Sequence, residues 1–163
     1  MTTTVRYQVK RNVGRPASPY GVAAKNSAFL KHQNRAHLAG IEMNLDILEY
    51  ISICEGLCVY CGIEGYVSEK KSNPNLASDW IHNGIDRVDS HGDYTLANSV
   101  TSCPYCNVKK STLSLYRFYN KVRREFLQSI VDGIYDEKLS RLFVNLLHAG
   151  VYAGGVTHDI RPC

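Results

Sequence analysis

Apolar residues recur at helical spacing in several stretches of the chain, and each such stretch predicts an amphipathic helix. The first clear one covers residues 45–55, where Asn44 is the expected N-cap and Gly56 follows the last turn. One face of this helix is apolar because it carries Leu45, Leu48 and Ile51. We therefore expect that face to pack against the rest of the domain.

Two longer helices are predicted in the C-terminal part of the chain. One covers roughly residues 112–131 and places on one side Leu115, Phe118, Tyr119, Val122 and Phe126. The other runs from Glu137 to His148, with Asp136 as N-cap and Gly150 as the stop. Its apolar side consists of Leu139, Leu142, Phe143, Leu146 and Leu147. Each stripe predicts either core packing or a dimer face.

The remaining stretches have weaker patterns. Residues 1–25 hold two prolines and two glycines without a hydrophobic period, which predicts an extended basic arm. Residues 26–39 carry a weak helical pattern, and residues 62–80 are polar and aperiodic, which predicts a loop. Residues 81–102 predict two strands joined by a turn and a loop, and a helix is expected from Pro104 onward. Helices around a small pair of strands make an α+β fold class.

The composition is that of a globular protein. The chain has 163 residues, of which 44% are hydrophobic and 21% are charged. No apolar run approaches the roughly 18 residues of a membrane span, and the first residues lack the apolar segment of a secretory signal. We therefore expect one domain with an arm, in the cytoplasm rather than secreted or in a membrane.

The basic residues are unevenly distributed. Residues 1–35 carry seven basic side chains and no acidic one, so the rest, with 12 basic and 15 acidic residues, has a net charge of −3. A second stretch without acids runs from Lys109 to Arg124. Two such blocks indicate a polyanionic partner, of which nucleic acid is the commonest. On charge alone, a solvated surface with a loose tail explains the pattern equally well.

Four of the six cysteines form two close pairs, Cys58-x-x-Cys61 and Cys103-x-x-Cys106. We call each Cys-x-x-Cys pair a cysteine hook. In a chain without a secretory signal, two such hooks predict a zinc site before they predict disulfides. The alternatives are a redox motif or four unrelated buried thiols. Zinc held by four thiolates has no open coordination position, so we expect this metal to be structural and the chemistry to lie elsewhere.

Between Cys58 and Lys110 the motifs follow in an order that resembles the HNH (ββα-metal, His-Me finger) endonuclease family, in its zinc-bearing branch. The residues that carry the resemblance are the two cysteine hooks, Gly84-Ile-Asp-Arg-Val-Asp89, Tyr94-Thr-Leu-Ala-Asn98, Asn107 and Lys110. It implies a ββα-metal core stapled by a four-cysteine zinc site, with flanking helices and the basic arm. We expect the arm over residues 1–36, the nuclease domain over 37–131 and a C-terminal helical extension over 132–163.

The resemblance also implies a catalytic metal site. In the family, the aspartate of an Asp-His pair binds a divalent ion and the histidine is the general base. Here the pair is Asp86-Arg87, so the usual histidine is missing. The branch typified by the restriction endonuclease PacI also has Asp-Arg at this point, together with an upstream histidine and tyrosine. We therefore expect Asp86 and Asn107 to hold Mg²⁺ or Mn²⁺, and the upstream pair to be His37 and Tyr50.

The missing histidine changes the expected roles. Arg87 cannot be a base, because its pKa exceeds about 12, but it can clamp two phosphate oxygens. A neighbouring guanidinium and metal would lower the pKa of Tyr50, which we expect to accept the proton with the help of His37. His82 and His91 are rival bases. Without the resemblance, an aspartate in a turn, a helix-capping asparagine and a packed tyrosine would explain these residues.

Other positions take supporting roles. Asn98 matches the middle asparagine of the family, so we expect it to tie the loop between the strands by hydrogen bonds. Phosphate contacts to DNA are expected from basic residues on the arm and the later helices. The candidates are Arg15, Lys31, Arg35, Lys109, Lys110 and Arg117.

Together these features predict a sequence-specific DNA endonuclease of restriction type. It would hydrolyse phosphodiesters in double-stranded DNA with one divalent ion and leave 5′-phosphate and 3′-hydroxyl ends. A homodimer fits cleavage of both strands by single-metal sites. The alternatives are a monomeric nicking or homing-type nuclease of the same family, and a zinc-stapled DNA-binding module that no longer cuts.

Overall fold

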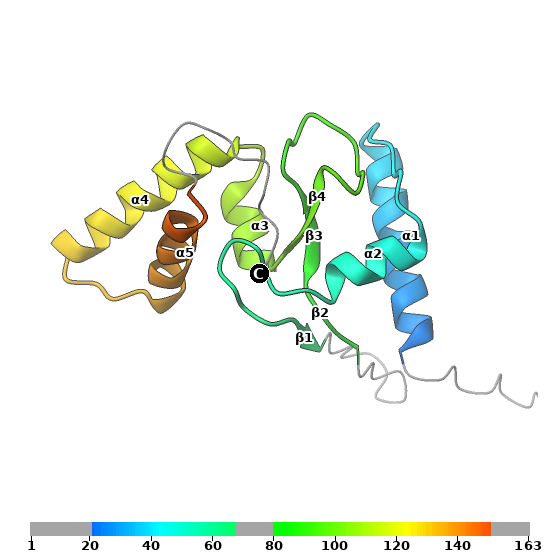
Figure 1. The fold of residues 1–163 in the computed structure, drawn as a ribbon, viewed down its shortest axis with the longest axis horizontal. Coiled ribbons are helices and arrows are strands. Elements are labelled where there is room, and N and C mark those ends of the chain that lie inside the picture. Colours follow the sequence, from blue (N-terminus) through cyan, green and yellow to red (C-terminus); the bar gives the residue numbers. More distant parts are fainter. Residues whose placement is uncertain (1–20, 68–79, 151–163) are drawn as a thin grey trace, which may run out of the picture.

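The computed structural model describes residues 21–67 and 80–150 and combines helices with two small antiparallel sheets (Figure 1). The α+β expectation is met in this form. Arg15, Cys163 and most of the expected arm lie outside the described residues. In chain order the elements are α1 (Val22–Leu38), α2 (Ile47–Cys54), β1 (Tyr66–Val67), β2 (Ile81–His82), β3 (Gly84–Arg87), β4 (Ser99–Ser102), α3 (Pro104–Lys110), α4 (Leu115–Val131) and α5 (Glu137–His148).

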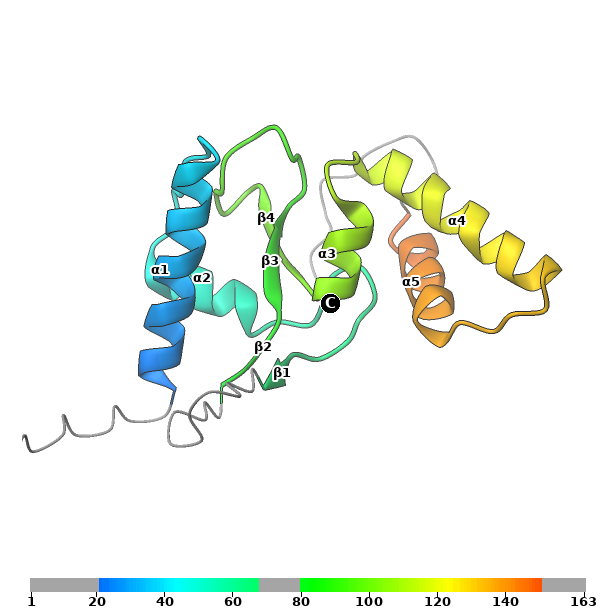
Figure 2. The same ribbon diagram turned by 180° about the vertical axis from the view of Figure 1, so that it is seen from behind.

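The β3–β4 hairpin is the centre of the fold. Its strands are antiparallel, with Gly84 opposite Ser102 and Asp86 opposite Val100. Helix α3 follows β4 after a single residue and packs against β3, which completes a ββα unit. Figures 1 and 2 show the hairpin between α1 and α2 on one side and α3, α4 and α5 on the other. The strands expected between residues 81 and 102 and the helix from Pro104 are therefore confirmed.

Two clusters of buried side chains flank the hairpin. One joins the four paired cysteines to α4 and α5 through residues such as Tyr60, Phe118 and Leu142. The other joins α1 and α2 to the hairpin through residues such as Tyr50 and Ile85. None of the described helices combines the length and the apolar character that a membrane crossing requires.

The N-terminal elements differ from the expectation in two ways. Helix α1 begins at Val22, and its Ala28 and Phe29 pack on the second cluster, so residues 22–36 belong to the folded domain rather than to an extended arm. Helix α2 is capped by Asp46, not by Asn44. The Asp46 carboxylate accepts hydrogen bonds from two backbone N–H groups of the first turn, and the Glu49 side chain accepts one from the Asp46 N–H.

The C-terminal helices follow the sequence more closely. Helix α5 has the expected bounds, and the Asp136 side chain caps it by accepting from the Leu139 N–H at 3.0 Å. Helix α4 begins at Leu115 rather than near residue 112, because Ser114 is its N-cap. The apolar stripes of the two helices pack together in the cluster around the cysteines. Most of both stripes is therefore core, and the boundary expected at residue 131 divides one packed helix pair.

Candidate active site and metal centre

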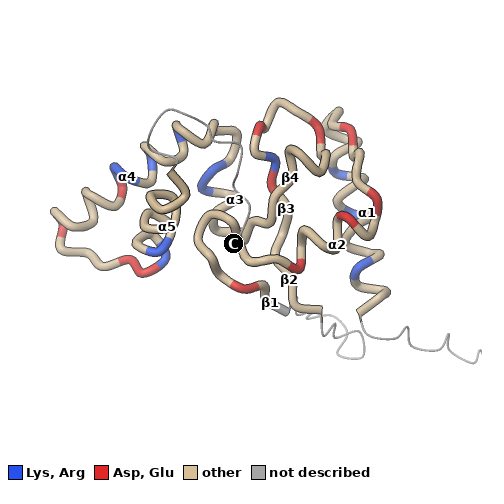
Figure 3. The backbone as a smooth tube through the Cα atoms, viewed as in Figure 1, with Lys and Arg blue, Asp and Glu red and all other residues tan. Residues whose placement is uncertain are grey.

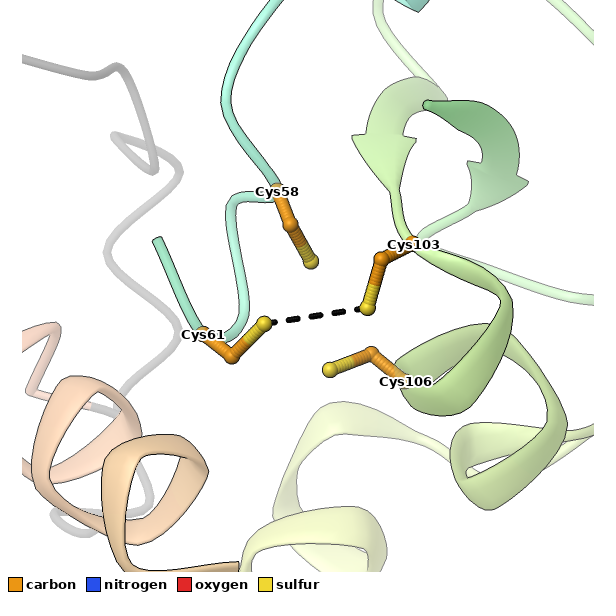
Figure 4. A group of neighbouring side chains, drawn as sticks. All are labelled: Cys58, Cys61, Cys103 and Cys106. Atoms are coloured by element: carbon orange, nitrogen blue, oxygen red, sulfur yellow. Dashed lines mark hydrogen bonds between the residues drawn. The ribbon is translucent and has the colours of Figure 1, made fainter. Parts of the chain in front are cut away.

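The four paired cysteines converge on one point between the chain before β1 and the start of α3 (Figure 4). All four are buried, and their sulfur atoms lie within 4.8 Å of one another. The Cys61 and Cys103 sulfurs are 3.7 Å apart. A regular tetrahedron with Zn–S bonds of about 2.3 Å has sulfurs about 3.8 Å apart, so the cluster could bind zinc.

Local backbone structure shapes both hooks. The Gly62 N–H donates to the Cys58 carbonyl at 2.7 Å, and Gly62 has a φ of 71°, which glycine adopts without strain. In the second hook, Cys103 is the N-cap of α3, and Pro104 follows as the first helical residue. Because the thiols share hydrogen bonds, the pKa of Cys103 is lowered to about 7 by Cys106, and that of Cys106 is raised. Zinc requires thiolates, and the ion itself would supply the charge that holds all four in that form.

Asp86 lies on β3 and is almost fully buried. Its Oδ2 atom accepts a hydrogen bond from the Tyr60 hydroxyl at 2.7 Å and pairs with the Lys110 ammonium at 3.0 Å. Burial raises the pKa of Tyr60, with a further contribution from the Asp86 charge, so this phenol stays a neutral donor. The Oδ1 atom of Asp86 accepts no hydrogen bond from the described residues. One carboxylate oxygen is therefore fixed by the protein and the other is left for a ligand.

Lys110 corrects the expectation that this side chain contacts DNA. The residue has no exposed surface, and its ammonium group donates to the Arg87 carbonyl at 2.7 Å and to the Ser90 hydroxyl at 3.3 Å, besides its ion pair with Asp86. A buried ammonium has three donors, and here all three have partners. Lys110 is therefore part of the interior, where it connects α3 to β3 and the following loop.

Asn107 lies one turn earlier on α3. Its Nδ2 group donates to the Ile85 carbonyl at 3.1 Å, and Ile85 is the neighbour of Asp86 on β3. This bond fixes the amide, and its Oδ1 atom accepts no hydrogen bond from the described part of the chain. Asp86 and Asn107 thus come from the facing strand and helix of one ββα unit, and each has one oxygen without a protein partner.

A cavity of about 680 Å³ adjoins this unit, and its walls come from α1, α2, the strands and α3. Asn107, Tyr50, Arg35 and Lys31 line it, so four of the expected site residues share one cavity. Asp86, Arg87 and His37 do not line it. The residues of α1 that do so follow a helical stripe, namely Ala24, Ser27, Ala28, Lys31, His32, Arg35 and Ala36. His37 falls outside that stripe and is exposed to solvent.

His32 is the histidine that α1 places in the cavity. Its ring meets Tyr94 edge-on, with centroids 4.7 Å apart, and lies 5.6 Å from the Tyr50 ring. Burial, followed by the nearby Arg35 and Arg87 guanidinium groups, lowers the pKa of His32 to about 4. The imidazole is therefore neutral at pH 7. Our expectations from the sequence did not include His32. A helix over residues 26–39 would have placed His32 and His37 on different sides, which is the signal that could have separated them.

Tyr50 lies in the cavity wall but does not have the lowered pKa expected for a proton acceptor. Burial raises its pKa, and the neighbouring Cys54 adds to the rise, whereas the Arg35 guanidinium only partly opposes it. The exposed fraction of Tyr50 is only 5%, which explains why desolvation outweighs the guanidinium. At pH 7 this phenol is neutral and can donate a hydrogen bond.

Arg87 extends from the end of β3 towards the same region. One guanidinium nitrogen donates to the Gly92 carbonyl at 2.6 Å, and the group lies 5.1 Å from the centre of the Tyr94 ring. Asn98 ties the loop that Arg87 contacts. Its side chain accepts from the Asp89 N–H and donates to the carbonyls of Asp89 and Asp93, all within 3.0 Å. A structural role for Asn98 rests on these three bonds.

The two rival histidines have different surroundings. His91 is exposed at the turn of the β3–β4 loop. The His82 ring is stacked on Trp80 with centroids 3.9 Å apart, and its Nδ1 atom lies 3.0 Å from the Trp80 carbonyl. His82 lines the cavity, but one ring nitrogen is already occupied and the ring is stacked with both Trp80 and Tyr66.

Basic residues occur along α1 and α4, which lie on opposite sides of the hairpin (Figure 3). Lys31 and Arg35 are exposed at the cavity. Arg117 is exposed on α4 and lines a hollow of about 480 Å³ together with Lys121 and Arg124. Lys109 differs from these, because it forms an ion pair with Glu125 and its ammonium lies 5.4 Å from the Tyr105 ring centre.

Comparison with known proteins agrees with this geometry. The family model described as HNH endonuclease matches residues 58–113, which include both cysteine hooks, Asp86 and Asn107. The match supports the HNH family for this part of the chain. His32 and Tyr50 precede the matched segment.

One viral protein is also similar to part of the chain. An uncharacterized protein of Acanthamoeba polyphaga mimivirus is 31% identical over 90 residues, which make up 55% of this chain. The aligned part is only 14% of that relative's length. No solved structure matches the chain significantly.

Proposed function

We propose that this protein is a DNA endonuclease that hydrolyses phosphodiester bonds at the cavity beside Asp86 and Asn107. The main support is the arrangement of these two residues. They lie on the strand and the helix of an HNH-matching ββα unit, and each has one oxygen without a partner among the described residues.

The donor set fits a hard divalent cation. A carboxylate oxygen and an amide oxygen are ligands that Mg²⁺ and Mn²⁺ accept, with water completing the shell. Bound there, such an ion would stabilise the charge that develops on the phosphate during hydrolysis. The fixed second oxygen of Asp86 and the anchored amide of Asn107 would limit how far either ligand can rotate.

His32 is our candidate for the general base, in place of His37. A base must lie within reach of the attacking water, and His32 is the histidine of α1 that lines the cavity. Its lowered pKa leaves the imidazole unprotonated at pH 7, so it can accept a proton without first losing one. Tyr50, as a neutral phenol beside His32, would orient the water or the phosphate by donating a hydrogen bond.

Arg87, Arg35 and Lys31 would hold the phosphate backbone. Arg87 uses one nitrogen on the Gly92 carbonyl and retains other donors for a phosphate oxygen. Lys31 and Arg35 are exposed at the same cavity, and Arg117 provides a second basic surface on α4. Such contacts predict affinity for DNA that falls steeply with salt concentration. The cysteine cluster would bind Zn²⁺ and keep the ββα unit folded.

Restriction-type activity is the finer part of the proposal. We propose a homodimer that recognises a sequence in double-stranded DNA and leaves 5′-phosphate and 3′-hydroxyl ends. Incubation of supercoiled plasmid with protein and Mg²⁺ tests this, followed by end-labelling of the products. Early linear DNA supports paired cleavage, open circles alone support a nicking enzyme, and a gel shift without cleavage supports a DNA-binding module.

A further inference from the structure

Three aromatic rings form a stack along the cavity. The rings of Trp80 and His82 are nearly parallel, at 8°, with centroids 3.9 Å apart. The Tyr66 ring continues the stack on His82, at 24° and 5.8 Å. All three residues line the cavity that also contains Asn107. None of them is used by the hydrolytic chemistry proposed above.

The stack follows from the short β1–β2 sheet. Tyr66 is directly opposite His82 in the antiparallel register, so the two side chains stand on the same face. Trp80 precedes His82 by two residues, which places it on that face as well. Gly65 permits the close approach of the strands, because a Cβ atom there would lie only 2.5 Å from the His82 backbone. The strand register, the two-residue spacing of Trp80 and His82, and Gly65 therefore determine the stack.

The inner end of the stack is fixed by polar contacts. Trp80 is buried, and its indole N–H donates to the Glu55 carboxylate at 2.9 Å. Glu55 pairs in turn with Lys25 at 2.6 Å, and that ammonium lies 5.8 Å from the Trp80 ring centre. Since a carbonyl only accepts, His82 donates through Nδ1 to the Trp80 carbonyl, which sets its ring plane. The stack is therefore a preformed surface.

The outer end of the stack is partly exposed. Tyr66 is 50% exposed, and no ring of the described residues other than His82 stacks on it. Exposed cations, Lys31 and Arg35, line the same cavity. An aromatic face and cations in the wall of one cavity match the two parts of a nucleotide, since the base can stack and the phosphate can pair with ammonium or guanidinium groups.

We propose that this stack, together with Lys31 and Arg35, binds an unpaired nucleotide of the DNA substrate, with its base on Tyr66. The nucleotide must be unpaired because bases inside a duplex cover each other's faces. This inference rests on the proposed function, since the same cavity would hold the cleaved strand. The base can come from single-stranded DNA or from a nucleotide extruded from a duplex.

A fluorescent base tests the proposal without any cleavage. Oligonucleotides carrying one 2-aminopurine, single-stranded in one arm and in a matched duplex in the other, are titrated with the zinc-loaded full chain without added magnesium. Stacking on a neighbouring base or on an aromatic ring quenches the probe. We therefore expect quenching in the single-stranded arm, whereas in the duplex, where the probe is already quenched, a base extruded onto Tyr66 should become brighter only in Tyr66→Ala. Tyr66→Ala should remove the quench and weaken binding about tenfold, because base–aromatic stacking contributes that much per base. Tyr66→Phe and Tyr66→Trp should retain both.

The control is Tyr135→Ala, which removes an 80% exposed tyrosine outside this cavity and should change neither quench nor affinity. Quenching of the single strand assigns the site to single-stranded DNA, and brightening of the duplex probe by Tyr66→Ala, without quenching of the single strand, assigns it to an extruded base. Neither of these responses, or Tyr66→Ala that quenches and binds within twofold of the wild type, would overturn the proposal. Plasmid cleavage, measured separately, would in that case still decide the proposed nuclease function.

Discussion

The ammonium group of Lys110 lies 3.0 Å from Oδ2 of Asp86, and both side chains are buried. This ion pair holds the carboxylate on β3 from the side of α3, while the Tyr60 hydroxyl holds the same oxygen. Asp86 therefore has one oxygen fixed within the protein and one without a partner among the described residues, and we propose the second as a metal ligand.

Replacing Lys110 by methionine should therefore strongly destabilise the domain. Removing one partner of a buried pair leaves an uncompensated charge, at a cost of about 3–5 kcal/mol. We expect urea unfolding of Lys110→Met to show such a loss, and Asp86→Asn in the same chain to recover a large part of it. A cost below about 1 kcal/mol for the single variant would show that the pair is not held as described.

His32 and His37 give a matched pair for testing the general base. They lie on the same helix, but only His32 lines the cavity. His32→Ala should lower the cleavage rate about 10²–10⁴-fold, the usual range for a positioned proton acceptor, whereas His37→Ala should stay within about twofold. Plasmid cleavage under single-turnover conditions measures both. A large loss of cleavage rate in His37→Ala with little loss in His32→Ala would instead identify His37 as the general base.

The lowered pKa of His32 predicts a pH dependence of stability. The group has a pKa of about 4 when folded and 6.5 when unfolded, so the unfolded chain binds more protons between these values. Its contribution is complete above pH 6.5 and is lost as the pH falls towards 4, at most about 1.4 kcal/mol per pH unit. Arg35 and Arg87, which face the ring, oppose its protonation in the folded state.

Urea unfolding at pH 7, 6 and 5 measures this dependence. His32→Phe keeps an aromatic ring but cannot titrate, so its free energy of unfolding should fall less steeply over that range. Carboxylates also titrate near the lower end, and the comparison of the two proteins separates their contribution. Equal slopes for wild type and variant would mean that His32 is not buried as a neutral imidazole.

Much of this arrangement was predictable where the determining contacts are local. The cysteine spacing predicted the cluster of four thiols, which could bind zinc, and the Asp136 cap with the leucine stripe predicted both bounds of α5. The position of α1 was harder to predict, because its buried face carries small residues such as Ala28 and little hydrophobic contrast. A pattern of that kind cannot separate an arm from a packed helix.

The errors at the site concern contacts between distant segments. Lys110 belongs to a basic stretch that resembles a solvated surface, and its burial depends on Asp86, which is 24 residues earlier. The raised pKa of Tyr50 depends on the burial of its ring within the α1–α2 cluster. Neither charge pattern nor helical period contains this information.

The cysteine cluster should be essential for folding. Its four cysteines are part of the buried core that joins α4 and α5, so removing one ligand should cost both metal and structure. We expect Cys106→Ser to lose bound zinc and much of its fixed tertiary structure, measured by metal analysis and near-UV circular dichroism. Cys54→Ser is the control, since Cys54 is buried outside the cluster and should keep one zinc per chain. Full zinc content in Cys106→Ser would contradict the assignment.

Titration of Mn²⁺ into the zinc-loaded protein tests most directly whether Asp86 and Asn107 share one ion. The account predicts about one binding site in the wild type, at least tenfold weaker binding in Asp86→Asn and in Asn107→Ala, and unchanged binding in Asp132→Asn, which alters an exposed acid at the end of α4. Circular dichroism of each variant confirms that it is folded. Wild-type Mn²⁺ affinity in folded Asp86→Asn and Asn107→Ala would contradict the central claim.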